Sequence, residues 1–413
     1  MPSLLSMQFR ESVSKHKDYR MKLESDATIS YPTGFLNFDF MNGNVVHIQN
    51  GEKDTKYYSV GIQDGCLVML IGRSGCGKTT WAFQTACNII RNFPNSTVFY
   101  DDIEGGCNPD RRLTLSCMTP EQLEDRCIYR NTGVTAENFY ERLRNIHDLK
   151  LNNRADYEYD TGMYDYNGKR IYKLQPTVYI LDSVALLMPA QYTEEEELSG
   201  SMSATAAAKT NSMSFKRIIP MLKAANIILF AINHINKKID INPMQRSKSQ
   251  VAYLKQDESL PGGNTIIYLT NILIRFDDNS KLKPEEGFGI DGNLVDISLI
   301  KSRNNRAGKV CTLVFNKALG YDPELTLFLM LKNAKKINGA GAYLYIGNLS
   351  DIKFAQKNFK QKLREYPELR QAFINEAIAI LKSDLDSSDS QTSGGYMDYS
   401  LSTDIMNQIN ADL

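Results

Sequence analysis

Residues 66–80 read CLVMLIGRSGCGKTT, a short apolar run that leads directly into a glycine-rich loop. The loop matches G-x-x-x-x-G-K-[ST], in which backbone N–H groups surround phosphate oxygens, the lysine reaches the terminal phosphates and the hydroxyl holds Mg²⁺. Apolar residues at helical spacing follow in KTTWAFQTACNIIRNF. This order predicts a strand, a phosphate-binding loop and a helix. We expect the loop to hold ATP through Gly72, Arg73, Ser74, Gly75, Cys76, Gly77, Lys78, Thr79 and Thr80.

The bulk composition narrows the class of protein without naming a partner. Among the 413 residues, 48 Lys plus Arg balance 48 Asp plus Glu, so a nucleic-acid-binding surface has to be a local patch. The seven cysteines are dispersed and none forms C-x-x-C, which indicates reduced thiols in a cytosolic protein and argues against a structural zinc site. We expect a soluble intracellular protein, because the sequence has neither a signal peptide nor an apolar run of about 18 residues.

Further apolar runs indicate the fold class. They occupy residues 97–101, 177–182, 227–232, 294–300 and 310–315, with amphipathic stretches between the earlier ones. Buried runs that alternate with helices predict an α/β fold with a mostly parallel sheet covered on both faces. Residues 152–174, rich in Tyr and Asp, predict a surface excursion or hairpin, and residues 236–261 predict a long loop.

The chain divides into four expected parts. Residues 1–28 form a polar, basic N-terminal segment, and residues 29–335 form the nucleotide-binding core. Helical patterning within residues 336–385 predicts a small C-terminal domain. Residues 386–413 carry acidic but no basic side chains, which predicts a disordered acidic tail.

Three polar side chains follow other apolar runs and complete a nucleotide site. Asp182 ends TVYILD and is expected to hold Mg²⁺ together with Thr79. Glu104 follows the run VFYDD and suits a group that orients water, although a solvated loop carboxylate is the alternative. His234 ends LFAINH, where a polar side chain reaches the γ-phosphate, but a lone histidine is more often structural.

At these residues the chain resembles the RecA-type strand-exchange recombinases, including the phage UvsX-like branch. The similar segments are YPTGFLNFDF at 31–40, YDDIEGGCNPDR at 100–111 and ILDSVALLMP at 180–189. The resemblance implies a RecA-type P-loop ATPase core with Glu104 as the catalytic glutamate. It also implies that Arg111 packs against adenine and that His234 replaces the family's nucleotide-sensing glutamine.

The resemblance further implies two loops that contact DNA, at about 194–213 and 236–261, the second closing on LPGGNTI. Basic side chains interleaved with an aromatic suit the phosphates of a single strand. Charge alone favours an ordinary solvated loop, and the GGN closure favours the DNA-binding interpretation instead. The implied DNA-binding residues are Met202, Lys209, Lys216, Lys237, Lys238, Arg246, Lys248, Tyr253, Lys255, Gly262, Gly263 and Asn264.

Two more similarities concern assembly and duplex DNA. Lys301 and Arg303 in LIKSRNNRAGK match the K-x-K pair that reaches the γ-phosphate of a neighbouring subunit in this family. A head-to-tail contact that does not close generates a helical filament, and the N-terminal segment is placed like the family's subunit-docking segment. Residues 339–373 are similar to the start of the bacterial C-terminal domain, which implies duplex DNA binding restrained by the acidic tail.

The resemblance implies an ATP- and Mg²⁺-dependent recombinase that acts in DNA recombination and repair. It forms filaments on single-stranded DNA, pairs that strand with a homologous duplex and hydrolyses ATP when bound to DNA. Single-strand-binding and loader proteins are expected partners, in the cytoplasm of a bacterium or a phage-infected host. One alternative is a replicative helicase, which needs a large N-terminal helical domain although the phosphate loop already begins at residue 72. The other is a recombinase paralogue that binds nucleotide as a scaffold.

Overall fold

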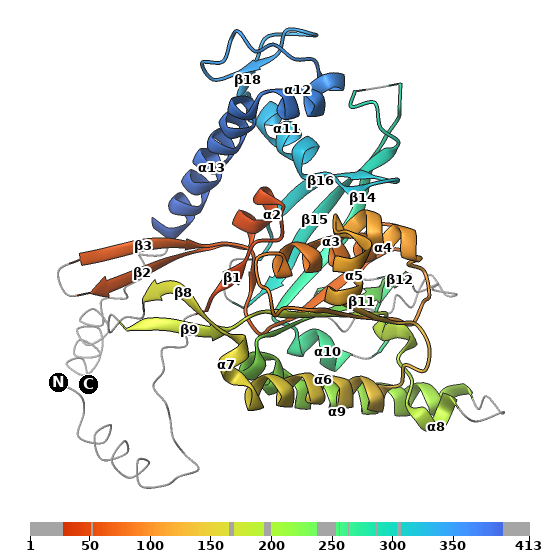
Figure 1. The fold of residues 1–413 in the computed structure, drawn as a ribbon. Coiled ribbons are helices and arrows are strands. Elements are labelled where there is room, and N and C mark those ends of the chain that lie inside the picture. The colour runs from red at the N-terminus through yellow and green to blue at the C-terminus, as the bar shows by residue number, and fades with distance from the viewer. Residues whose placement is uncertain are drawn as a thin grey trace, which may run out of the picture.

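The largest element of the protein is a sheet of nine strands. The computed structural model describes residues 28–50, 53–164, 169–193, 200–237, 253–255, 257–262, 264–285, 287–303 and 307–390. Within these ranges the strand order of the large sheet is β17-β16-β15-β14-β5-β11-β10-β6-β7. Figure 1 shows this sheet at the centre of the molecule, with helices above and below it.

The strands from β14 to β7 all run parallel. They are β14 (Ile272–Leu282), β5 (Leu67–Gly72), β11 (Ile227–His234), β10 (Thr177–Asp182), β6 (Val98–Asp102) and β7 (Cys127–Arg130). An antiparallel extension adds β15 (Gly292–Ser302), β16 (Val310–Asn316) and β17 (Gly320–Tyr321). The predicted α/β class with a mostly parallel sheet is therefore confirmed, and β14 and β7 are strands that the sequence analysis did not identify.

Successive residues of the central strands face opposite layers of helices. Val68 and Leu70 of β5 pack in one apolar cluster with Trp81 of α3 (Lys78–Ile90). Leu67 and Met69 pack in a second cluster on the other face. The first layer also holds α4 (Pro109–Ser116) and α5 (Pro120–Arg126), and the second holds α6 (Ala136–Asn152), α9 (Gly200–Ala225) and α10 (Asn264–Leu269). Burial on both faces explains why these strands are continuous apolar runs.

Small elements surround the sheet. Before β5 lie β1 (Ser30–Tyr31), α2 (Leu36–Met41), β2 (Asn44–Asn50), β3 (Lys53–Ser59) and β4 (Ile62–Gln63). After α6 come α7 (Arg154–Tyr157) and the antiparallel pair β8 (Glu158–Tyr164) and β9 (Arg170–Leu174), so the hairpin predicted within 152–174 is confirmed. The remaining core elements are η2 (Val184–Leu186), α8 (Ala190–Thr193), β12 (Asn236–Lys237) and β13 (Glu258–Ser259).

The two expected DNA loops have different outcomes. Residues 200–213 belong to α9, so the expected loop at 194–213 is wrong for this part. The run from Ala204 to Ala208, with four alanines in five residues, explains the difference, because alanine has the highest intrinsic helix propensity. Residues 194–199 lie outside the described residues. In the second loop, β12 pairs with β13, and residues 238–252 and 256 lie outside the described residues.

The C-terminal unit has an aromatic core of its own. It contains α11 (Pro323–Asn333), β18 (Ile337–Asn338), β19 (Tyr345–Ile346), η3 (Gln356–Asn358), α12 (Phe359–Glu365) and α13 (Pro367–Ser390). Phe328 of α11 packs against Phe354, Phe359 and Phe373. Because Phe328 precedes residue 335, the expected domain boundary at 335/336 runs through this core.

The acidic tail begins later than expected. Helix α13 continues to Ser390, and Asp386 forms an ion pair with Lys56 at 2.7 Å and accepts a hydrogen bond from Tyr58 at 3.0 Å. Residue 386 is therefore part of a helix attached to the β2–β3 hairpin, which corrects the expected start of the tail. Residues 1–27 and 391–413, where the N-terminal segment and the rest of the tail were predicted, lie outside the described residues. None of the helices in the described ranges has the length and apolar character to span a membrane.

Candidate functional site

The glycine-rich loop connects the carboxyl end of β5 to α3, and Tyr321 packs against it. Gly77 has φ of +85°, and a Cβ on it would lie 2.4 Å from the Tyr321 hydroxyl. This hydroxyl donates a hydrogen bond to the Cys76 carbonyl at 3.2 Å, and the tyrosine is 2% exposed. Glycine is therefore required at position 77 both by backbone conformation and by space. No local sequence pattern links Tyr321 to the loop, because it lies 245 residues away in sequence.

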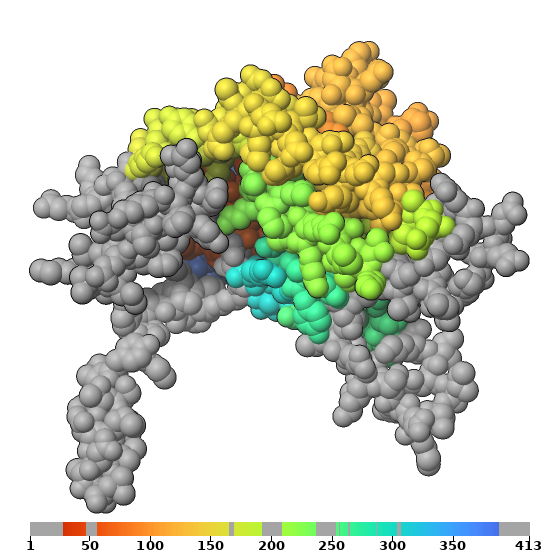
Figure 2. Space-filling view, turned by 90° about the horizontal axis from the view of Figure 1, so that it is seen from below, coloured from red at the N-terminus to blue at the C-terminus, as the bar shows by residue number. Residues whose placement is uncertain are grey.

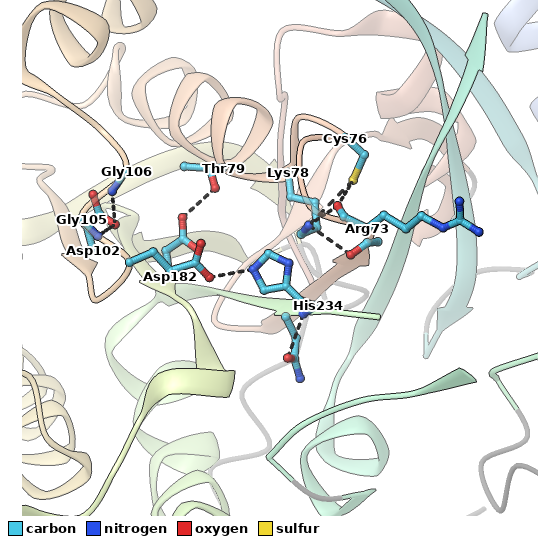
Figure 3. A network of polar contacts seen from close by, with 12 residues as sticks. Arg73, Cys76, Lys78, Thr79, Asp102, Gly105, Gly106, Asp182 and His234 are labelled. Atoms are coloured by element: carbon cyan, nitrogen blue, oxygen red, sulfur yellow. Dashed lines mark hydrogen bonds and ion pairs between the residues drawn. The ribbon is translucent and has the colours of Figure 1, made fainter. Parts of the chain in front are cut away.

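Lys78 lies inside the loop with its ammonium group on main-chain carbonyls. The Nζ atom donates to the carbonyl oxygens of Gly72 at 3.1 Å and Arg73 at 2.8 Å. The residue is 4% exposed, and a buried ammonium group needs such acceptors. Figure 3 shows this group turned toward the loop while the Arg73 guanidinium extends away from it.

Thr79 and Asp182, the two residues expected at Mg²⁺, are in contact. The Thr79 hydroxyl donates to Oδ2 of Asp182 at 2.6 Å, and burial raises the pKa of Asp182 to about 6. Within the described residues, Oδ1 of Asp182 is buried without a hydrogen-bond partner. A buried carboxylate oxygen without a partner beside a hydroxyl fits a magnesium ion, because Mg²⁺ at nucleotide sites uses one or two protein ligands together with phosphates and waters. No group of three or more His, Cys, Asp or Glu side chains that could hold a metal occurs in the described ranges.

Glu104 lies on a turn that joins β6 to the next helix and is tied to β10. The backbone N–H groups of Ile103 and Glu104 both donate to the Asp182 carbonyl, at 2.6 and 3.3 Å. The carboxylate of Asp102, which ends β6, accepts from the N–H groups of Gly105 and Cys107 at 2.9 and 3.0 Å. This turn therefore holds Glu104 beside the carboxyl end of β10, where Asp182 lies.

His234 contacts the Glu104 carboxylate directly. Its Nε2 atom lies 2.6 Å from Oε1 of Glu104. Residue 234 is paired with Gly72 in the β11–β5 register, so the imidazole lies at the same sheet edge as the phosphate loop. The neighbouring Asn233 donates to the Pro261 carbonyl at 2.8 Å, which joins the end of β11 to the end of the 236–261 segment. The structure thus brings Lys78, Thr79, Glu104, Asp182 and His234 together at one edge.

Arg111 is held by the turn between β16 and β17. Its Nη1 atom donates to the carbonyls of Lys317 and Ala318 at 3.0 and 2.5 Å, and its backbone N–H is capped by Asn108 at the start of α4. The guanidinium is therefore attached to exposed main chain. Packing against adenine stays a prediction.

Lys301 and Arg303 lie toward the other end of the sheet. In the strand register Lys301 is opposite Leu273, and Leu273 is opposite Met69, near the start of β5. The phosphate loop begins after Gly72, three residues further along and thus roughly 10 Å away along the strand. The cations donate to the last carbonyls of α10: Lys301 to Ile267 and Tyr268 at 3.0 and 2.9 Å, and Arg303 to Tyr268 and Leu269 at 3.0 and 3.3 Å.

The expected DNA-binding residues are only partly described. Lys209 and Lys216 are exposed on α9, and Lys255 is exposed near β13. Tyr253 packs against the second apolar cluster, with the Lys301 ammonium 5.8 Å from its ring centroid. Its ring is therefore attached to the core, and a role of Tyr253 in DNA binding stays a prediction. Gly262 has φ of +85° and adjoins Val184.

At some other expected DNA-binding positions the structure describes the helix or strand but not the side chain. The remaining positions lie outside the described residues. Met202 belongs to α9, Lys237 to β12 and Asn264 to α10, but their side chains lie outside the described residues. Lys238, Arg246, Lys248 and Gly263 lie outside them altogether. These assignments stay predictions.

The geometry at this edge suits the binding of a nucleoside triphosphate with Mg²⁺ and the activation of water. A glycine-rich loop opens a helix, and a carboxylate and a hydroxyl lie beside it, with a second carboxylate after β6, three strands from β5 in the sheet. No protein-family model matches the chain, and no curated protein matches its sequence. Function is therefore inferred from the fold and the geometry of the site.

Proposed function

We propose that this chain is a RecA-type recombinase, an ATPase that assembles into helical filaments on single-stranded DNA and catalyses homologous pairing and strand exchange. The observation that carries the proposal is the separation of two groups of residues. The phosphate loop lies at the carboxyl end of β5, whereas Lys301 and Arg303 lie toward its beginning. Cations at that end suit the pocket of a neighbouring molecule.

At the phosphate loop, each residue has a distinct role. Lys78 exchanges its carbonyl acceptors for β- and γ-phosphate oxygens, and Thr79 with Asp182 holds Mg²⁺, which neutralises charge on the phosphates. Glu104 orients the attacking water once His234 has released it. His234 is the group that exchanges its contact with Glu104 for a phosphate oxygen, so it reports the presence of the triphosphate.

Hydrolysis is completed between molecules. Lys301 and Arg303 of one protomer leave the α10 carbonyls and reach the γ-phosphate bound by the next, where positive charge stabilises the transition state. Repetition of this head-to-tail contact gives an open helical filament rather than a closed ring. ATP turnover therefore depends on assembly.

The contacts with DNA follow from exposed charge and from one structural link. Lys209 and Lys216 on α9 and Lys255 near β13 offer exposed ammonium groups to phosphates. Asn233, next to His234, holds the Pro261 carbonyl at the end of the 236–261 segment. A strand bound by that segment is therefore coupled to the triphosphate. In this proposal the C-terminal unit engages duplex DNA.

A nucleotide-binding scaffold is the second candidate, and the contact between His234 and Glu104 favours it. A carboxylate held at 2.6 Å by an imidazole is not available to water unless the contact opens. A scaffold would keep this contact closed and would bind ATP without DNA-dependent turnover.

ATP turnover with and without single-stranded DNA separates the two candidates. We expect DNA to stimulate the wild-type rate at least tenfold, and Glu104→Gln to lower that rate by about 10²–10⁴ while ATP binding persists. Electron microscopy should then show Glu104→Gln filaments that outlast those of the wild type. Glu124→Gln, an exposed carboxylate of α5, is the matched control with normal turnover. A wild-type rate that ignores DNA, with particles that stay dispersed, would contradict the recombinase and favour the scaffold.

A further inference from the structure

The turn that carries Glu104 is held on its far side by a buried carboxylate. Asp102 is 1% exposed. Its Oδ1 atom accepts from the N–H groups of Gly105 and Gly106 at 2.9 and 3.4 Å, and its Oδ2 atom accepts from the Cys107 N–H at 3.0 Å. A carboxylate buried to this degree depends on its donors, so their geometry determines the geometry of the turn.

A further donor to Asp102 comes from the edge of the sheet. The Tyr129 hydroxyl donates to Oδ2 at 2.9 Å. Tyr129 lies on β7, which is the last strand of the sheet order and pairs with β6. Its ring packs edge-on against Tyr100 with the centroids 5.4 Å apart. The tyrosine thus connects the edge strand to the turn.

Arg112 closes this arrangement. Its guanidinium carbon lies 3.6 Å from the Tyr129 ring centroid, which is a close cation–π stack. The same side chain donates through Nη1 to the Cys107 carbonyl at 2.5 Å. Arg112 therefore contacts both the tyrosine that holds Asp102 and the last residue of the turn.

The need for such support follows from the contacts of Glu104 itself. Its carboxylate is held by His234 in this structure, and that contact has to open before the carboxylate acts on water. The backbone of the turn then remains as the support: the Asp182 carbonyl accepts from residues 103 and 104 on one side, and Asp102 accepts from residues 105 to 107 on the other. A misplacement of about 1 Å in a catalytic group costs roughly 10²-fold in rate.

We propose that Tyr129 and Arg112 are positioning residues that act through Asp102 to keep Glu104 directed at the phosphate loop. The inference rests on the proposed function, since it concerns the group that orients water. Neither residue touches the nucleotide in this scheme. Their loss should therefore change the catalytic step and leave binding unchanged.

Tyr129→Phe tests the inference because it keeps the ring and its stack and removes the hydroxyl. We expect kcat for DNA-stimulated ATP hydrolysis to fall about tenfold while KM and the Kd for ATP stay within twofold. Tyr172→Phe is the matched control, because Tyr172 is 51% exposed on β9, and its kcat should equal that of the wild type. Arg112→Lys, which keeps the charge and loses the planar stack, should give a smaller fall in kcat and serves as the second variant if Tyr129→Phe does not fold.

A double-variant comparison distinguishes positioning from a general structural effect. Because Tyr129 acts through Glu104, adding Tyr129→Phe to Glu104→Gln should leave the residual rate unchanged. A further tenfold loss in that background would overturn the inference, as would an unchanged kcat for Tyr129→Phe beside an active wild type. A wild type without turnover is a different result: it overturns the proposed function, and the inference with it.

Discussion

Two groups of cations lie toward opposite ends of β5 and make the same kind of contact in different surroundings. Lys78 donates to carbonyls of its own loop and is 4% exposed. Lys301 and Arg303 donate to the last carbonyls of α10, and Arg303 is exposed. Figure 2 shows that face: the cyan atoms near residue 300 lie on the surface beside the green atoms of α9. The first group is enclosed, whereas the second is open to another molecule.

Under the proposed function, the two groups differ in the contacts that each gives up when it binds phosphate. Lys78 exchanges carbonyls for phosphates within one loop, so its backbone surroundings remain. Lys301 and Arg303 cap the carboxyl end of α10, where positive charge is favourable, and α10 loses these donors when they leave. Burial and the nearby Arg303 also lower the pKa of Lys301, so this ammonium group gains from an anionic partner. Under the proposed function, the enclosed group works within one chain and the open group works between chains.

Removal of the enclosed group should have the largest effect. Lys78→Ala should weaken ATP binding by more than 10²-fold and abolish turnover with or without DNA, because no other described ammonium group lies on the carbonyls of this loop. Titration with a fluorescent ATP analogue, followed by a phosphate-release assay, measures both. Lys281→Ala, which removes an exposed lysine at the far end of β14, is the control. ATP affinity that survives in Lys78→Ala would remove the distinction between the two groups.

A mixture of two inactive variants should show most clearly whether Lys301 and Arg303 act on the pocket of another molecule. Glu104→Gln has a defective pocket with intact cations, whereas Lys301→Ala/Arg303→Ala has an intact pocket without cations. In a filament of equal parts, about a quarter of the contacts join an intact pocket to intact cations, so roughly a quarter of the wild-type turnover should return. A mixture of Glu104→Gln with Lys78→Ala is the control, since both defects lie in the pocket and no contact is complete. Equal inactivity of both mixtures would refute action between molecules.

The sequence predicts the phosphate-loop end well because its strands are buried on both faces. β5, β10 and β11 are continuous apolar runs, and the motif residues lie at or just after their carboxyl ends. The apolar pattern did not predict β14, because only Ile272–Phe276 of this strand is buried. The buried part includes Arg275, which is paired with Glu258 at 2.8 Å. A pattern of apolar residues does not reveal a strand whose buried charge is neutralised by a residue elsewhere in the chain.

Contacts between strand ends could not be predicted from the sequence, for a different reason. Glu104 and His234 are 130 residues apart, and their strands, β6 and β11, lie on either side of β10. The strand order, which no local pattern specifies, brings them to 2.6 Å. The same holds for Tyr321 beneath the loop and for Tyr129 behind the turn. Motifs predict the candidate site residues at this edge, and the topology determines which of them touch.

The smallest predicted effect concerns the buried carboxylate of Asp182. Its replacement should raise the stability of the fold and weaken the binding of nucleotide. Burial raises the pKa of Asp182 from 3.8 to about 6, so the folded state holds its proton more tightly than the unfolded chain. Wild-type stability then falls as pH rises between about 4 and 6, and the ionised carboxylate costs about 1–3 kcal/mol at pH 8. Asp182→Asn should remove that cost and raise the Tm of the nucleotide-free protein by a few degrees at pH 8. The gain should vanish as pH falls toward 4.

The same substitution should weaken Mg²⁺-dependent ATP binding, because an amide replaces a carboxylate ligand. Calorimetric titrations with Mg²⁺ and with EDTA measure this loss, and scanning calorimetry across pH measures the Tm. Asp101→Asn is the matched control: Asp101 is also buried, but it is paired with Arg130 and Arg142 at 2.8 and 2.5 Å. Loss of a paired buried charge costs roughly 3–5 kcal/mol, so the control should melt lower while Asp182→Asn melts higher. If both variants have a lower Tm than the wild type at pH 8, groups of the protein already stabilise the ionised Asp182 carboxylate. The site then does not need a cation to compensate this charge.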